Sequence, residues 1–489
     1  MNIRLTLFEA RRLLRNPILW GTAVLALVRA YVQSTAWLPD MTIVVIDAVT
    51  ASALIGAAMM IVSGLAAGRD RRHGLPETLA ALPVRAVERT RAVILAAPAA
   101  GALLAAVMIS VQSAAVSLPG GAAGRFDPYQ ALGGVALGAL AATAGAALGR
   151  WLPWLITPPI VIVLVALAMI GDSRGENFGW FLPVIPGHSV AWGARPTGWH
   201  LVYLVAAVVL FAALALLRHG LRPLRTLVAL TALAVAVPAG AAATAAAPVL
   251  PWAGDRAAFT PQLPEQVCEK HEGLTFCVYP DYRPWIPGWV DALRPILAVV
   301  PERARDRVPP IRQLAGYDGL LWQGSGADPL ATPVTWTVWS ADPARHRAYL
   351  AGQVIASAVG LEKESCGADL GRARLAVALW LAGRAGPLLD APDPGSRPPS
   401  SGKLPKGWLD LTMGFDNGGI HIPGQLHDTG YGQAEVEYAR ALLNRPETAD
   451  RIRADWDVLV SPSTTLEQGA ALLGVRPGRP ASRKDELCR

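Results

Sequence analysis

Long apolar stretches fill the first half of this 489-residue chain, and they restrict what it can fold into. A helix needs roughly 20 mostly apolar residues to cross the hydrocarbon core of a bilayer. Seven stretches of about this length occur before residue 251, with most of the charged residues gathered between them. The predicted spans are residues 17–36, 43–67, 92–116, 128–149, 152–171, 200–218 and 226–250. The sequence therefore predicts an α-helical polytopic membrane domain over residues 17–250 and excludes an ordinary soluble enzyme.

Arginine is distributed unevenly between the two ends of these spans. Residues 1–250 hold 18 arginines, no lysine and 9 acidic residues. With the N-terminus in the cytoplasm, 14 of these arginines fall in cytoplasmic segments and 3 in loops on the opposite side. Basic residues accumulate on the cytoplasmic side, so this orientation is favoured, and seven spans then place residues 251–489 outside the cytoplasm. We expect a multi-pass protein of the cell membrane, and we assign the basic charge to membrane topology rather than to a nucleic-acid partner.

Residues 1–16 precede the first span and carry several arginines. Leu5, Phe8 and Leu13 lie between the basic positions, a pattern typical of an amphipathic helix at the membrane interface. A cleaved signal peptide and a charged flank that only sets topology are the alternatives.

Two charges of opposite sign lie inside the first two predicted spans. Arg29 precedes the turn near Leu38-Pro39 by about ten residues, and Asp47 follows that turn by about eight. At 1.5 Å per residue of helix, both side chains lie roughly 12–15 Å from the turn. Charges in a membrane are commonly tolerated as pairs. We therefore predict an intramembrane pair of Arg29 and Asp47, which we favour over a substrate site.

Several glycines of the fourth span are spaced so that they lie on common faces of the predicted helix. Small residues on such faces let helix backbones approach closely. We therefore interpret this pattern as helix packing rather than as a ligand site. The glycines concerned are Gly133, Gly134, Gly138 and Gly145.

The segment between the second and third spans, residues 69–85, reads RDRRHGLPETLAALPVR. It resembles the first cytoplasmic loop of the permease subunits of type-2 ABC exporters. In that family a run of basic residues and a glycine come before a glutamate and a leucine. A stretch of leucine, proline, then valine or a hydroxyl residue, then arginine leads into the third span. The resemblance covers roughly residues 1–225. The chain departs from the family pattern at Leu75-Pro76, where a small residue is usual, and in its seventh span and large outer domain.

The resemblance implies a short coupling helix that docks on an ATP-binding subunit and transmits its motion. Pro83 would end this helix, because the residue before a proline avoids the helical conformation. A solvated basic loop that only fixes topology is the alternative. The residues that the resemblance assigns to coupling are Gly74, Glu77, Thr78, Leu79, Leu82 and Pro83.

The chain contains no G-x-x-x-x-G-K-[ST] motif, which NTPases use to hold nucleotide phosphates. If the resemblance holds, ATP and Mg²⁺ bind to a separate ABC ATP-binding subunit, and this chain binds no cofactor and is not itself an enzyme. A second permease chain, in a homodimer or a heterodimer, and the lipid bilayer are its other expected partners.

Residues 251–489 have the composition of a soluble domain, for which alternating strand and helix patterns predict an α+β fold. Residues 267–280 predict a hairpin with Glu272-Gly273 as a two-residue turn, which places Cys268 opposite Cys277. We predict a disulfide between these two, because an extracytoplasmic domain permits oxidation. Four cysteines allow three connectivities, so the state of Cys366 and Cys488 stays open.

Motifs for catalysis are missing from this outer domain. The helices predicted near 344–360 and 370–385 have the layout of a gluzincin metallopeptidase core, yet H-E-x-x-H is absent, and Gln353, Ala356 and Ser357 occupy the matching helix. His421 and His427 lie in a Pro/Gly-rich segment and lack a third strong ligand. We therefore assign no catalytic residue and no metal site.

Two functions are compatible with these patterns. The first is the permease subunit of an ABC transporter, with export as the expected direction, driven through residues 69–91. The alternative is a membrane-anchored sensor, receptor or degenerate peptidase-like protein whose outer domain binds a ligand or partner. Residues 69–91 discriminate between them, since a simple anchor has no use for a coupling loop.

Overall fold

The structure is a computed structural model, and it shows a mostly helical chain. The chain divides into two compact units, Met1–Leu250 and Pro251–Arg489. The described residues are 3–34, 39–72, 85–118, 120–152, 154–172, 178–186, 195–247, 265–313, 332–334, 343–361, 370–385 and 433–478.

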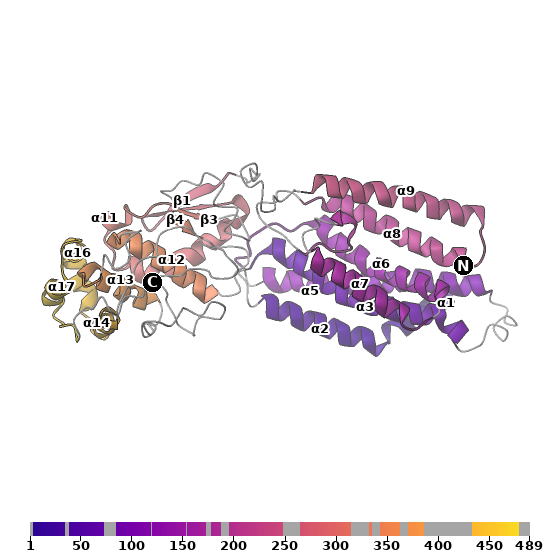
Figure 1. The fold of residues 1–489 in the computed structure, drawn as a ribbon, viewed down its shortest axis with the longest axis horizontal. Helices are drawn as coiled ribbons and strands as arrows, with labels where there is room; N and C mark the ends of the chain where they lie inside the picture. The colour runs from indigo at the N-terminus through magenta and orange to yellow at the C-terminus, as the bar shows by residue number, and fades with distance from the viewer. Residues whose placement is uncertain are drawn as a thin grey trace. The chain divides into compact units, whose positions relative to one another are not determined.

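Unit 1 consists of helices that run side by side (Figure 1). Four of the described helices of this unit, α2, α6, α7 and α9, have a proline in the first turn, where no backbone N–H is needed. The Asp127 carboxylate, just before α6, accepts hydrogen bonds from two first-turn amides. The elements are α1 (Ile3–Leu14), α2 (Pro17–Ser34), α3 (Met41–Arg72), α5 (Ala86–Ser117), α6 (Pro128–Trp151), α7 (Thr157–Gly171), the 3-10 turn η1 (Gly179–Phe181), α8 (Thr197–Leu217) and α9 (Pro223–Ala246).

Helix α6 packs against α3, α5 and α8, and glycines make this packing close. A methyl group built on Gly138 would overlap the backbone carbonyl of Gly101 on α5, and the reverse holds as well. A methyl group on Gly145 would likewise overlap the carbonyl of Met60 on α3. Gly133 makes only ordinary van der Waals contact with α8. A methyl group on Gly134 would overlap side-chain atoms of Val49 on α3 and Ile109 on α5. The prediction that these glycines serve helix packing is confirmed for Gly134, Gly138 and Gly145.

Five of the described helices are long and apolar enough to cross a membrane, which supports a helical membrane protein. They are α3, α5, α6, α8 and α9, with α3 counted over Met41–Arg69. The predicted spans 17–36 and 152–171 correspond to the shorter apolar helices α2 and α7. At 1.5 Å per residue the 15 residues of α7 rise about 22 Å, which is less than the roughly 30 Å of a hydrocarbon core.

Unit 2 contains a four-stranded sheet in the order β1-β2-β3-β4. Strand β1 pairs antiparallel with β2, β2 pairs parallel with β3, and β3 pairs parallel with β4. A parallel pair needs a crossover, which the chain makes through η4, α10 and α11. The strands are β1 (Val267–His271), β2 (Leu274–Val278), β3 (Ile311–Gln313) and β4 (Thr332–Val334), and the crossover elements are η4 (Pro280–Trp285), α10 (Ile286–Leu297) and α11 (Glu302–Arg305).

The β1–β2 hairpin has the predicted turn and register. Glu272 and Gly273 both have positive φ angles, 49° and 89°, as a two-residue type I′ turn requires. This turn places Cys268 directly opposite Cys277, and a disulfide joins them. The predicted disulfide is confirmed, while Cys366 and Cys488 lie outside the described residues.

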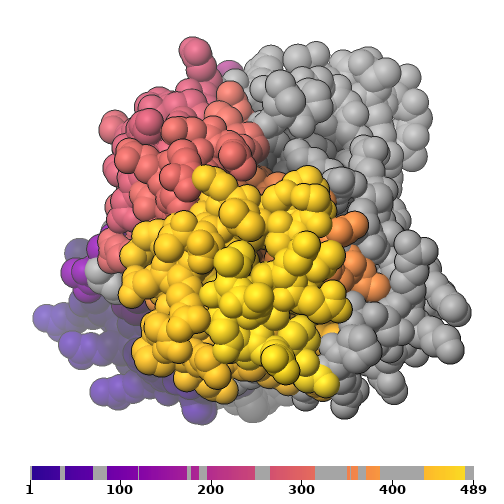
Figure 2. Space-filling view, turned by 90° about the vertical axis from the view of Figure 1, so that its left-hand side faces the viewer, coloured from indigo at the N-terminus to yellow at the C-terminus, as the bar shows by residue number. Residues whose placement is uncertain are grey.

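The core of unit 2 lies between the sheet and its helices. Phe276 of β2 packs against Trp289 of α10, and both are fully buried. Helix α13 is buried along almost its whole length, between α10, α12, α14 and α17. The C-terminal helices gather on one face, coloured yellow in Figure 2. The remaining helices are α12 (Pro343–Val359), α13 (Ala373–Ala385), α14 (Gln433–Leu443), α15 (Thr448–Ala454), α16 (Trp456–Leu459) and α17 (Leu466–Leu473).

Candidate functional site at the basic end of the helical unit

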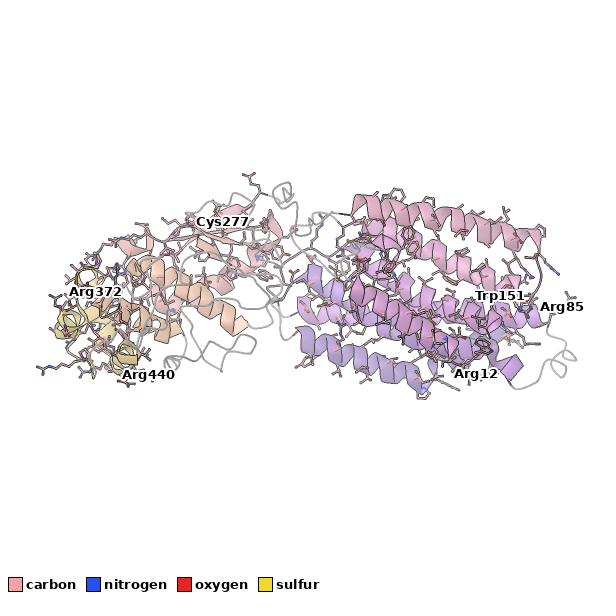
Figure 3. The ribbon with its side chains drawn as sticks, in the orientation of Figure 1. Arg12, Arg85, Trp151, Cys277, Arg372 and Arg440 are labelled. Atoms are coloured by element: carbon pink, nitrogen blue, oxygen red, sulfur yellow. A yellow bond between two sulfur atoms is a disulfide. The ribbon has the colours of Figure 1, made fainter. Side chains whose placement is uncertain are left out.

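Six helices of unit 1 bring their arginine-rich ends together, and we call this region the basic end. It comprises α1, the C-terminal ends of α3, α6 and α8, and the N-terminal ends of α5 and α9. Figure 3 shows Arg12, Arg85 and Trp151 at this end of the unit. A buried apolar cluster beneath it contains Ala67 of α3 and Val93 of α5, together with residues of α6 and α8.

An ion pair between a buried glutamate and a partly exposed arginine joins α1 to α3 at the basic end. Arg69, near the end of α3, donates from a guanidinium nitrogen to Glu9 Oε1 at 3.2 Å, and the Glu9 side chain is only 5% exposed. A buried carboxylate is costly unless it has a partner, so this pair ties the position of α1 to that of α3. Leu13, on the same face of α1, lies in an apolar cluster with residues of α2, α3 and α5.

Side chains also tie α8 to its neighbours at this end. Thr90 of α5 and His219, just beyond α8, form a hydrogen bond of 2.7 Å. The Trp151 indole donates to the carbonyl oxygen of Leu214 at 2.8 Å, and the Arg218 guanidinium lies 5.8 Å from the centre of the Trp151 ring. These contacts bind α5, α6 and α8 into one framework.

Positive charge exceeds negative charge at the basic end. Two glutamates with described side chains each pair with an arginine: Glu9 with Arg69, and Glu88 with Arg91 at 2.5 Å. Arg225 donates to the carbonyl oxygen of Leu216 at 3.1 Å and brings a further charge. More arginines with described side chains lie here than these glutamates can neutralise, namely Arg4, Arg11, Arg12, Arg15, Arg85, Arg89, Arg150, Arg218 and Arg222.

The predicted coupling segment connects two helices of this region. Helix α3 ends at Arg72 and α5 begins at Ala86, so the chain leaves and re-enters the described structure at the basic end. The coupling residues themselves lie outside the described residues, and their roles stay predictions. They are Gly74, Glu77, Thr78, Leu79, Leu82 and Pro83.

The predicted charge pair lies across α2 and α3. Arg29 on α2 interacts electrostatically with Asp47 on α3, and the two helices pack together. Arg29 is exposed on the surface of the unit, whereas Asp47 is half-buried. The role of the pair, structural or substrate-binding, stays a prediction.

Sequence reasoning missed a cationic and aromatic cluster at the opposite end of unit 1. The Arg195 guanidinium lies 5.0 Å from the centre of the Trp180 ring and donates to the carbonyl oxygen of Ile185 at 2.7 Å. Burial lowers the pKa of Arg195 to about 10, although Asp127 acts in the opposite direction. Trp180 also makes an edge contact with buried His200. The signal in the sequence that could have indicated this cluster is the pair Trp180 and Phe181, since aromatic residues collect at membrane interfaces.

The described part of unit 2 contains neither a metal-binding cluster nor zinc ligands in the peptidase-like layout. Among its described residues, no group of three His, Cys, Asp or Glu side chains is placed to hold a metal ion. Helix α12 carries Ala356 and Ser357, whose side chains are not zinc ligands, and the side chain of Gln353 is outside the description. His421 and His427 also lie outside the described residues.

Comparison with known proteins returned no match from family models, from curated proteins or from solved structures.

Proposed function

We propose that this chain is the permease subunit of an ABC transporter of the exporter type, driven by a separate ATP-binding subunit. The observation that carries the proposal is the construction of the basic end. Residues 73–84, which lie within the segment 69–85 that resembles a coupling loop, join two long helices there, and the Glu9–Arg69 pair ties α1 to α3 just before them. An anchor that only holds an outer domain needs no such tie.

The proposed mechanism transmits force from the partner into the helical unit. Closure of the ATP-binding subunits around ATP and Mg²⁺ would displace the coupling loop, and the loop would move α3 and α5. Helix α6 would follow, because it packs against both of them through glycine contacts that leave no room for slippage. The helical unit would thus exist in two conformational states. Nucleotide would shift the equilibrium toward the state for which the complex binds it more tightly, by an amount set by the difference in affinity.

The proposal includes a membrane location and two kinds of protein partner. The basic end faces the cytoplasm, seven spans place unit 2 on the other side, and a second permease chain completes the pathway. The charge distribution supports this orientation, since 14 arginines fall at the proposed cytoplasmic side.

Purification of the tagged full-length chain from its native membrane tests the proposal. We expect an ATP-binding subunit to co-purify and the complex to hydrolyse ATP, with activity that depends on that subunit. Tagging a membrane protein of similar abundance from the same cells is the control for non-specific recovery. Failure to recover any ATP-binding subunit from complexes that retain the intact chain would contradict the proposal.

A membrane-anchored sensor or receptor is the second candidate, and the outer unit favours it. Unit 2 has its own core around Trp289, Trp380 and Trp456, each at most 1% exposed, so it is a folded body rather than a long loop. A receptor predicts that deleting residues 251–489 abolishes function and that no ATP-binding subunit is recovered with the intact or the shortened chain. A permease predicts that the helical unit alone still binds that subunit.

A further inference from the structure

Helix α1 has two faces of different chemistry. Its inner face packs on α5 and carries Leu13 and Glu9, both at most 3% exposed. On the opposite face Arg4 and Arg11 are seven residues apart, which is nearly two full turns, and both are exposed. Arg15 follows four residues later on the same side, with its backbone amide bonded to the Arg11 carbonyl at 3.1 Å. The three guanidinium groups form one stripe, the α1 arginine stripe.

Exposed apolar side chains flank the α1 arginine stripe. Ile3 and Leu7 lie on one side of it and Phe8 on the other, and each is at least 55% exposed. A helix with arginine and large apolar residues on its outer surface is typical of the region between lipid headgroups and acyl chains. Among the described residues no acidic side chain forms an ion pair with the stripe.

We propose that the α1 arginine stripe binds the phosphate groups of anionic phospholipids in the leaflet that it borders. Guanidinium groups bind phosphate oxygens through paired, charge-assisted hydrogen bonds, and Ile3, Leu7 and Phe8 supply apolar contact with the acyl chains. Among the described side chains no acid neutralises the three positive charges of the stripe, which therefore complements an anionic surface and not a zwitterionic one.

The ion pair on the inner face gives this lipid contact a route to α3. Glu9 lies on the same helix as the stripe, and its partner Arg69 stands three positions before the last residue of α3. Bound lipid would fix the position of α1, and the ion pair would then fix the end of α3. The lipid site requires only a bilayer around unit 1, so it does not depend on the proposed transport function.

Native mass spectrometry of the purified full-length chain tests the site. The chain in neutral detergent is titrated with phosphatidylglycerol or with phosphatidylcholine, and bound lipids are counted. We expect preference for phosphatidylglycerol, and a loss of roughly fivefold in its affinity for each arginine removed in an Arg4→Gln, Arg11→Gln, Arg15→Gln variant. The Arg4→Lys, Arg11→Lys, Arg15→Lys variant keeps the charges and should keep the preference.

The matched control removes three exposed arginines from unit 2, by Arg307→Gln, Arg451→Gln and Arg476→Gln. This variant should bind phosphatidylglycerol as the wild type does. Equal binding of the two lipids by the wild type, or an unchanged preference in the α1 glutamine variant, would overturn the proposal. Loss of preference in the lysine variant would overturn it as well. If the glutamine variant instead loses only its ATP-binding subunit, the stripe is a protein-docking surface and the lipid site is wrong.

Discussion

Gly101 of α5 and Gly138 of α6 approach so closely that a methyl group on either one would overlap the backbone carbonyl of the other. Contacts of this kind replace the hydrophobic driving force that helices lack inside a lipid phase, because backbones gain dispersion contacts when they touch. The backbones of α5 and α6 therefore touch at this point, where no larger side chain fits between them.

Replacing Gly138 by alanine should therefore push α5 and α6 apart. We expect Gly138→Ala to lower the free energy of unfolding by about 1–3 kcal/mol, the usual cost of overpacking. Thermal unfolding of the purified chain measures the change. The matched control is Gly21→Ala on α2, where a methyl group meets no atom within 4 Å. Equal melting temperatures for the two variants would contradict the packing argument.

The coupling loop can be tested with two substitutions in residues 73–84. Glu77→Lys together with Leu82→Asp should reduce recovery of the ATP-binding subunit by roughly tenfold or more, because an apolar anchor and a charge are both lost from the interface. Quantitative pull-down measures this, with membrane insertion checked in parallel. Glu302→Lys with Leu472→Asp, at exposed positions of unit 2, is the control pair. Normal recovery with the Glu77 and Leu82 changes would count against the coupling role.

The proposed orientation predicts which cysteines an impermeant reagent can reach. In a chain with Cys366→Ser and Cys488→Ser, a cysteine at Asp450, whose side chain is 82% exposed, should be labelled in intact cells. A cysteine at Arg85, exposed at the basic end, should be labelled only after the cells are permeabilised. The opposite pattern would reverse the orientation, and labelling of both sites in intact cells would show that an even number of spans separates Arg85 from Asp450.

Removing the disulfide should weaken unit 2. Cys268→Ser with Cys277→Ser is expected to lower the free energy of unfolding by about 2–3 kcal/mol, since the bond closes a short loop in the unfolded chain. Thermal unfolding, with Cys366→Ser and Cys488→Ser as the matched control, measures the difference. Non-reducing peptide mapping should recover the two cysteines as one crosslinked peptide. Their recovery as separate alkylated thiols from oxidised membranes would show that the bond does not form.

A surface cluster on β1 should make unit 2 sensitive to acid. Hydrogen bonds from His271 at 3.2 Å and Arg283 at 2.6 Å lower the pKa of the Glu269 carboxyl. A carboxyl whose pKa is lowered by folding stabilises the fold above its unfolded pKa of about 4.3, and this contribution disappears as the pH falls through the folded pKa.

Glu269→Gln should therefore remove part of the stability loss that the wild type shows between neutral and acidic pH. The effect should be at most about 1 kcal/mol and should shrink in high salt, because the partners are solvent-exposed. Unfolding curves across that pH range measure it, with Glu302→Gln on α11 as the control. An identical pH dependence in wild type and Glu269→Gln would contradict the assignment.

The features that could be predicted from the sequence depend on local rules. A two-residue turn at Glu272-Gly273 leaves one register for the hairpin, so the partner of Cys268 followed from counting along the strands. The glycine spacing in α6 likewise indicated close packing before any partner helix was known. In both cases the determinant lies within a few residues of the feature.

Other features depend on residues that lie far apart in the sequence, or on prolines that delay the start of a helix. Arg69 is 60 positions from Glu9, and no local pattern marks a glutamate among arginines as the buried one. The predicted span 152–171 contains Pro153 and Pro158, and the helix begins only at Thr157, which leaves α7 short. Strand β3 has three residues, too few for an alternating pattern to be visible.

The hairpin has a consequence for the order in which the protein matures. Cys268 and Cys277 are separated by nine residues, and the turn between them is local. Their bond therefore needs no segment beyond Val278, and it can close while the ribosome is still adding the helices that follow. Oxidation of the two thiols to this disulfide would then record that the segment has already reached a compartment with an oxidant. With unit 2 outside the cytoplasm, as we propose, a thiol-trapping time course during synthesis would reveal when the hairpin crosses the membrane, before the rest of unit 2 has folded.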